Sequence, residues 1–169
     1  MIDDQLILDT IDKFLARDVK PVAKELELRD EYPHDIVAKM RELGLFGATI
    51  GEAYGGLGLP AVTYARIVER VSAVWMSVSG IFNSHLIMCA AIEKFGTEAQ
   101  KEQYLPRLAS GELRGGIALT EPDCGTDLQA VRTRADLAGG QYTVNGTKQW
   151  ITNSVNGNIL LVLVKTDLA

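Results

Sequence analysis

Two short polar stretches hold the residue types that could do chemistry. The first, IALTEPDCGTDL at residues 117–128, follows a strand-like run. Pro122 forces a bend, and Gly125 relaxes the backbone just before Thr126 and Asp127. Such a loop presents N–H groups and hydroxyls to a concavity. Because it contains no Lys or Arg, it suits a flat, hydrogen-bonding heterocycle or a carbonyl better than a phosphate. A solvated β-turn is the plainer alternative.

The second stretch is KQWITN at residues 148–153. We expect Trp150 in a strand with Thr152 on the same face, since side chains alternate along a strand. An indole beside a hydroxyl is suited to flank an aromatic ring and to hydrogen-bond its heteroatom. The alternative is a core tryptophan next to an ordinary strand threonine.

The elements before these stretches are expected to be helical. Apolar residues recur at helical spacing in two early segments, Ile7, Ile11, Phe14 and Leu15 in the first and Ile36, Val37, Met40 and Leu43 in the second. A glycine-dense loop at 51–60 leads into a helix from about Val62, with a break expected near Ser79-Gly80. Thr97 caps a last helix that ends at Gly111.

After Gly111 the pattern changes to short strands. The stretches GGIALT, VRTRAD, QYTVNGTKQWIT and NILLVLVKT are β-branched or alternating, with hairpin-type turn signals at 138–140 and 145–147. The predicted fold class is α+β: an all-helical domain at 1–113, then a truncated antiparallel β domain at 114–169. The chain stops at Ala169 after its most hydrophobic strand, so we expect a fragment, or a chain that needs a partner.

Composition excludes several function classes. The 169 residues carry a net charge of -5 and no Lys/Arg block, which argues against nucleic-acid binding. Two cysteines give no disulfide framework and no paired metal spacing, and His34 and His85 lack a second ligand at metal spacing. The acidic N-terminus does not resemble a secretory signal. We therefore expect a cytoplasmic protein without a metal site.

One segment, residues 71–92, has no charged side chain and is long enough to cross a bilayer as a helix. Hydrocarbon would penalise its polar side chains, Ser72, Ser77, Ser79, Asn83, Ser84 and His85. A helix buried in a protein core hydrogen-bonds such groups, so we expect this location and no membrane partner.

Four stretches together resemble the N-terminal half of the acyl-CoA dehydrogenases. They are ELGLFGATIGEAYGGLGL, EKFGTEAQKEQYLPRLASGEL, GGIALTEPDCGTDL and NGTKQWITN, and they lie in the order typical of that family. The resemblance extends over nearly the whole chain. The resemblance implies a three-domain flavoprotein. This chain would supply the N-terminal helical domain and the first part of the middle β domain, with the C-terminal helical bundle absent.

The resemblance also implies FAD as cofactor. In the family, Thr120 would lie near the flavin pyrimidine edge and Thr152 near N5, while Thr126, usually serine, would touch both FAD and acyl-CoA. The implied cofactor-binding residues are Ile117, Ala118, Leu119, Thr120, Gly125, Thr126, Trp150, Ile151 and Thr152. Cys124 stands where small residues are usual, and we do not interpret it as a redox centre.

The implied reaction introduces an α,β double bond into an acyl-CoA thioester. A glutamate removes the α-proton, and hydride passes to flavin N5. In the family this base comes from the C-terminal bundle, so no catalytic residue is expected in this chain. Glu121 is therefore interpreted as structural. Electron-transferring flavoprotein as acceptor and a homotetramer are family expectations. The alternative function is a non-catalytic helical interaction or scaffold domain that retains the fold.

The resemblance leaves open one further question about the uncharged helix. Phe82, His85 and Cys89 share a helix face, on the helix that borders the acyl chain in this family. Ordinary core packing is the preferred interpretation of these three residues, with a substrate pocket as the alternative.

Overall fold

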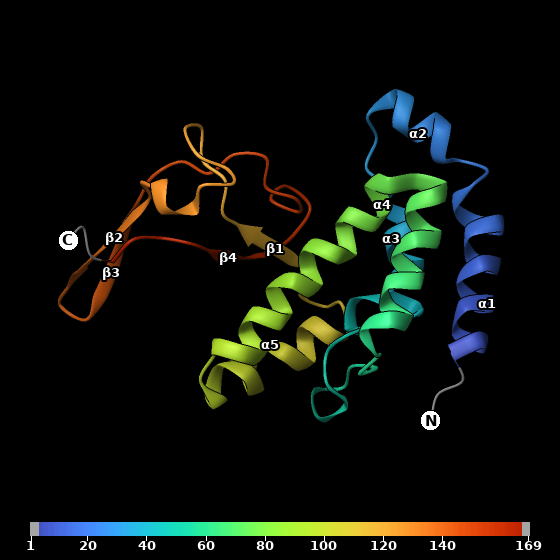
Figure 1. Ribbon diagram of the computed structural model, residues 1–169, viewed down its shortest axis with the longest axis horizontal. Helices are drawn as coiled ribbons and strands as arrows, with labels where there is room; N and C mark the ends of the chain where they lie inside the picture. The colour runs from blue at the N-terminus through green and yellow to red at the C-terminus, as the bar shows by residue number, and fades with distance from the viewer. Residues whose placement is uncertain (1–3, 167–169) are drawn as a thin grey trace.

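A computed structural model describes residues 4–166 as a helical layer followed by a small β region (Figure 1). The helices are α1 (Asp4–Phe14), α2 (Ala23–Arg29), α3 (His34–Glu42), α4 (Ala61–Phe95) and α5 (Glu98–Ala109), with a π-helical turn at Leu15–Val19. The expected α+β order, with helices first and strands second, is confirmed. The expectation about the chain end at Ala169 falls outside the described residues.

The β region contains two separate pairs of strands. β1 (Gly115–Ala118) pairs in parallel with β4 (Ile159–Val162), and β2 (Arg134–Ala138) pairs antiparallel with β3 (Gln141–Asn145). The antiparallel arrangement therefore holds for the hairpin alone. A parallel pair requires a long connection, and the whole segment between β1 and β4 provides it.

The two predicted hairpin turns have different outcomes. Gly139 and Gly140 have φ of 58° and 77° and form the β2–β3 turn, as predicted. The turn predicted at 145–147 does not join two strands, because β3 ends at Asn145. A Cβ on Gly146 would lie 2.3 Å from Thr133 Oγ1, so only glycine allows the chain to pass this close to its neighbour.

The hydrophobic core lies between the helices. The apolar faces predicted for α1 and α3 pack into this core, although Ile7 and Leu43 are only partly buried. The helix α4 packs against α1, α5 and β1. Gly44, in the left-handed conformation with φ of 73°, ends the α3 segment as predicted. The β hairpin, by contrast, extends away from the helical layer (Figure 1), and every residue of β3 is exposed.

The helix α4 breaks at Trp75, not at Ser79-Gly80. Trp75 has φ of -157° and ψ of 102°, and helical structure continues through Gly80. The Trp75 indole donates a hydrogen bond to Glu27 of α2, and Ser79 Oγ donates to Met76 O at 2.7 Å to close the corner. A long-range contact therefore decides the position of the break, and Gly80 is tolerated inside the helix.

The helix α4 is also long and apolar enough to cross a membrane, and half of its most apolar window is buried in the protein. Within it, Ser79 and His85 are buried and find hydrogen-bond acceptors in Met76 O and Leu108 O. These contacts match the expectation for a helix in a protein core.

Candidate functional site

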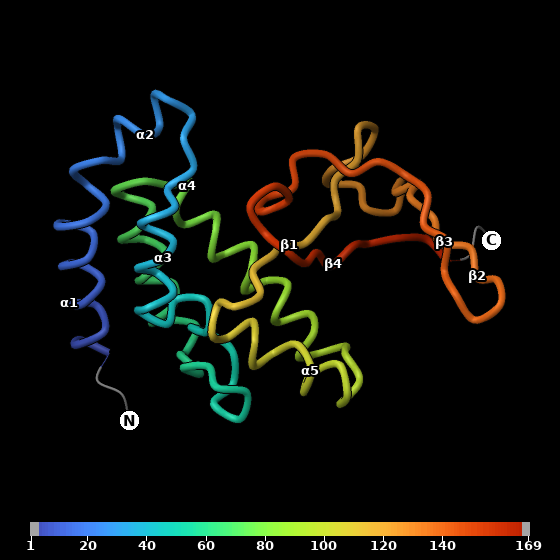
Figure 2. The backbone as a smooth tube through the Cα atoms, turned by 180° about the vertical axis from the view of Figure 1, so that it is seen from behind, coloured from blue at the N-terminus to red at the C-terminus, as the bar shows by residue number. Residues whose placement is uncertain are grey.

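The two polar stretches lie side by side at the end of β1 (Figure 2). The backbone N–H of Gln149 donates to Thr120 O at 2.9 Å. Lys148 Nζ donates to Leu119 O at 2.9 Å. The loop that follows β1 is therefore hydrogen-bonded to the segment that leads into residues 151–156. The β2–β3 hairpin lies between these two segments in the sequence.

The first stretch is a tight, partly exposed turn. Glu121 and Cys124 exchange backbone hydrogen bonds of 2.9 and 3.2 Å, and the Cys124 side chain is buried. Gly125 and Thr126 are exposed, and a Cβ added to Gly125 would meet no atom within 4 Å. The turn therefore leaves open space beside the predicted cofactor-binding residues Gly125 and Thr126.

The strand predicted around Trp150 is not formed. Trp150 has a positive φ of 58° and its side chain is 83% exposed, while Thr152 lies in a turn. Asn153 also has a positive φ of 67°, and its amide Nδ2 donates to Ile81 O and Gly115 O at 2.9 and 2.6 Å. A backbone with positive φ at positions 150 and 153 is not extended, so strand alternation does not place Trp150 and Thr152 on one face.

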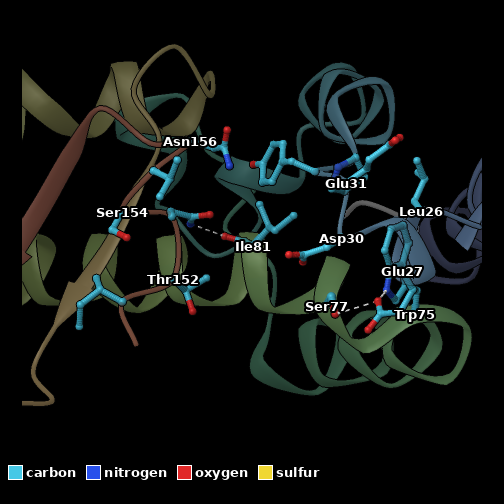
Figure 3. Close-up of a pocket in the computed structure, with 15 residues that line it drawn as sticks. Leu26, Glu27, Asp30, Glu31, Trp75, Ser77, Ile81, Thr152, Ser154 and Asn156 are labelled. Carbon is cyan, nitrogen blue, oxygen red and sulfur yellow. Dashed lines mark hydrogen bonds between the residues drawn. The ribbon is translucent and has the colours of Figure 1, made fainter. Parts of the chain in front are cut away.

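Thr152 lies close to both β1 and α4. A Cβ on Gly116 would lie 2.6 Å from Thr152 O and from Ser84 Oγ, so a side chain at position 116 would displace the loop. Beyond this contact, a cleft of about 540 Å³ separates residues 151–156 from the helical layer (Figure 3). Its helical wall includes Trp75, Ser77 and Ile81 of α4.

The structure therefore brings together only part of the predicted site. Ile151 and Thr152 line the cleft, whereas Thr120 does not. The carbonyl of Thr120 accepts a hydrogen bond from Gln149, which precedes the segment that lines the cleft. Ile117 and Ala118 belong to β1, where they are paired with Leu161 and Val162, and Leu119 follows at the end of the strand.

The donor groups of the two stretches fit a flavin ring. Within residues 4–166, the backbone N–H groups of Thr120, Thr126, Ile151 and Thr152 have no acceptor. Two of these residues, Thr126 and Thr152, also expose their side chains, and so does Trp150. A set of free N–H groups, hydroxyls and an indole matches the ring nitrogen and carbonyl acceptors of an isoalloxazine.

The carboxylate of Glu121 is fully engaged. It accepts hydrogen bonds from the N–H of Arg132 at 2.6 Å, the N–H of Thr133 at 2.9 Å and Lys148 Nζ at 2.8 Å. Burial alone would raise the pKa of Glu121, but these hydrogen bonds outweigh it and lower the pKa to about 2. Glu121 is therefore an ionised, structural residue, as predicted.

Two residues without a predicted role are central to this arrangement, Lys148 and Asn153. Lys148 is nearly buried, with 11% of its side chain exposed. No local pattern pairs it with an acid 27 positions earlier. The one signal is a lone lysine two positions before the apolar pair Trp150-Ile151. Asn153 joins the loop to α4 and β1 through its amide.

The face of α4 that carries Phe82, His85 and Cys89 belongs to the core, since all three side chains are fully buried. His85 Nδ1 accepts from the N–H of Gly115 at 3.3 Å, and Nε2 lies 3.2 Å from Leu108 O. Burial lowers the pKa of His85 to about 4, so the ring is neutral. Among the described residues, no group of three potential ligands could hold a metal ion.

Comparison with known proteins identifies the family. The acyl-CoA dehydrogenase N-terminal domain matches residues 2–112, and the middle domain of the same family matches residues 116–169. The chain therefore belongs to the acyl-CoA dehydrogenase family.

Individual relatives agree with this assignment. The chain is 36% identical to the short-chain specific acyl-CoA dehydrogenase of Clostridium acetobutylicum, over 98% of this chain and 44% of that protein. It is 34% identical to a chain in the structure of the electron transferring flavoprotein of Acidaminococcus fermentans, with a TM-score of 0.92, over 99% of this chain and 44% of that one.

A third relative was solved with a bound cofactor. The glutaryl-CoA dehydrogenase of Mycobacterium smegmatis in complex with FADH2 is 30% identical, with a TM-score of 0.91, over 99% of this chain and 43% of that one. The chain spans less than half the length of the curated relatives it matches.

Proposed function

We propose that this chain forms part of an FAD-dependent acyl-CoA dehydrogenase, in which it holds the flavin ring. The observation that supports this function is the junction of the two stretches through Gln149 and Thr120, flanked by N–H groups without acceptors. When bound, FAD would accept the β-hydrogen of an acyl-CoA as hydride while a base removes the α-proton, which yields a trans-enoyl-CoA and reduced FAD.

The residues of this chain would bind and orient rather than transfer protons. The N–H groups of Thr120 and Thr152 would donate to the ring, and fixed donors of this kind stabilise charge that develops during reduction. Thr126 would contact both FAD and the acyl-CoA. We propose no base within the chain, because Glu121 is ionised but already accepts three hydrogen bonds.

We also propose electron-transferring flavoprotein as the electron acceptor, a homotetrameric assembly and a cytoplasmic location. The first proposal is supported by the similarity to the Acidaminococcus fermentans structure. The other two rest on the family resemblance and on the composition of the chain.

The test is to express the complete reading frame that contains this sequence and to record the visible spectrum of the purified protein. We expect a yellow protein whose flavin is bleached by an acyl-CoA in the absence of oxygen, with release of the enoyl-CoA. A colourless protein that takes up no FAD and turns over no acyl-CoA would refute the proposal. The 169-residue chain alone is expected to bind FAD weakly, because Trp150 is largely exposed to solvent in it.

A further inference from the structure

Lys148 lies at the junction of the two flavin-binding stretches. Its ammonium group donates to Glu121 Oε1 at 2.8 Å and to Leu119 O at 2.9 Å. Only 11% of the Lys148 side chain and 5% of the Glu121 side chain are exposed. A buried ammonium group with two fixed acceptors has a defined position, so its electrostatic effect on neighbouring groups is also fixed.

The Glu121 carboxylate maintains this position. It is itself held by the backbone N–H groups of Arg132 and Thr133, so it cannot turn away from Lys148 without losing both bonds. The charges of the pair compensate each other in a site from which water is largely excluded. The ammonium group is thereby directed at Leu119 O.

The carbonyl of Leu119 and the N–H of Thr120 belong to the same peptide group. A cation that donates to a peptide oxygen draws electron density from the nitrogen through amide resonance, which makes the N–H a stronger donor. The Thr120 N–H has no acceptor within residues 4–166, while Thr120 O is held by the N–H of Gln149. The polarised N–H is therefore available to a ligand and fixed in orientation.

We propose that Lys148 is a positioning residue that acts through the Leu119–Thr120 peptide group to strengthen the Thr120 N–H donor toward the flavin. This inference rests on the proposed function. A stronger donor favours the reduced flavin, because reduction adds negative charge to the ring. Loss of Lys148 should therefore make the flavin harder to reduce and lower kcat, with little change in the KM for acyl-CoA.

The experiment compares Lys148→Gln, Lys148→Arg and Glu121→Gln in the flavoprotein expressed from the complete reading frame. FAD affinity is measured by flavin fluorescence, and the reduction potential by equilibration with a reference dye. We expect Lys148→Gln to weaken FAD binding about tenfold, the effect of one charge-assisted hydrogen bond, and to lower the potential. Lys148→Arg should keep most of the wild-type potential.

Glu121→Gln separates polarisation from simple structural support. The glutamine amide oxygen can still accept from Lys148, so the ammonium group keeps its bond to Leu119 O without the compensating negative charge. The potential should therefore stay at or above the wild-type value even though thermal stability falls. The control is Arg132→Gln, which breaks the exposed ion pair with Asp123 in the same region and should leave all flavin properties unchanged. If Lys148→Gln does not fold, the double variant Glu121→Gln/Lys148→Gln, which has no unpaired buried charge, replaces it.

The outcomes are distinguishable. An unchanged potential in Lys148→Gln or in the double variant overturns the inference while the proposed function stands. A shift in Glu121→Gln as large as that in Lys148→Gln also overturns it, since the pair would then act only by holding the loops together. A wild-type protein that binds no FAD overturns both the proposed function and the inference.

Discussion

At the scale of single residues, His85 shows how burial fixes a protonation state. Its ring is fully buried, packs edge-on against Phe46 at 5.2 Å between centroids, and accepts a hydrogen bond from the N–H of Gly115. Desolvation lowers the pKa of His85 from 6.5 to about 4. The imidazole therefore joins α4 to β1 only in its neutral form, because protonated Nδ1 could not accept that bond.

This coupling predicts a pH dependence of stability. Because the folded pKa lies below the unfolded one, the contribution of His85 is complete above pH 6.5 and is lost as the pH falls toward 4. Between pH 7.5 and 5.5 we expect a loss of about 1.4 kcal/mol in the free energy of unfolding. Urea unfolding at the two pH values measures it.

One variant controls this measurement. His85→Gln should be less stable at both pH values but should lose less stability on acidification. If His85→Gln and wild type lost equal stability between pH 7.5 and 5.5, the conclusion that His85 is neutral in the folded protein would be wrong.

At the scale of elements, the start of α5 depends on a capping box. Thr97 Oγ1 accepts from the N–H of Gln100 at 3.3 Å, and the Gln100 side chain accepts from the N–H of Thr97 at 2.9 Å. We expect Thr97→Ala to lower the free energy of unfolding by about 1 kcal/mol, with Thr97→Asn near wild type. In Thr10→Ala, which removes an exposed mid-helix hydroxyl, stability should not fall. Equal losses in the two alanine variants would argue against the cap.

The corner of α4 depends on a contact from another helix. Glu27→Ala removes the acceptor of the buried Trp75 indole N–H. We expect a loss of about 1–3 kcal/mol, the penalty of an unsatisfied buried donor, measured by urea unfolding. The matched control Glu25→Ala breaks an exposed ion pair with Arg29 and should cost about 0.5 kcal/mol or less. Equal effects of the two substitutions would mean that Glu27 does not hold the corner.

The comparison of these elements shows what the sequence could predict. Thr97 and Gly44 act on their own helices, so local patterns were sufficient to identify them. The break at Trp75 coincides with a contact to Glu27 of α2, and the segment next to Trp150 is held by bonds from Gln149 and Lys148 to the loop after β1. These partners are distant in the sequence, so no local pattern contains them. The two stretches of the candidate site were recognised from their residue types. The role of Lys148 was missed, because its partners are also distant in the sequence.

At the scale of the whole molecule, the cleft lies between two parts of unequal burial. The helical layer holds most of the core, whereas strand β3 and the loop up to Thr147 are exposed. The chain has one tryptophan in each part, Trp75 in α4 and Trp150 beside the cleft. Single-tryptophan variants therefore report the unfolding of each part separately, Trp150→Phe for the helices and Trp75→Phe for the β region.

Without FAD, we expect the Trp150 signal to change at a lower urea concentration than the Trp75 signal, because two-stranded sheets with exposed faces are marginal by themselves. A ligand that binds only the folded state adds about 2.7 kcal/mol of stability at 100 times its Kd. FAD at that concentration should therefore move the Trp150 transition toward that of Trp75. FAD could instead shift the urea midpoint of the Trp75 transition and leave that of Trp150 unchanged. This result would show that the flavin ring binds in the helical layer and not at residues 150–152.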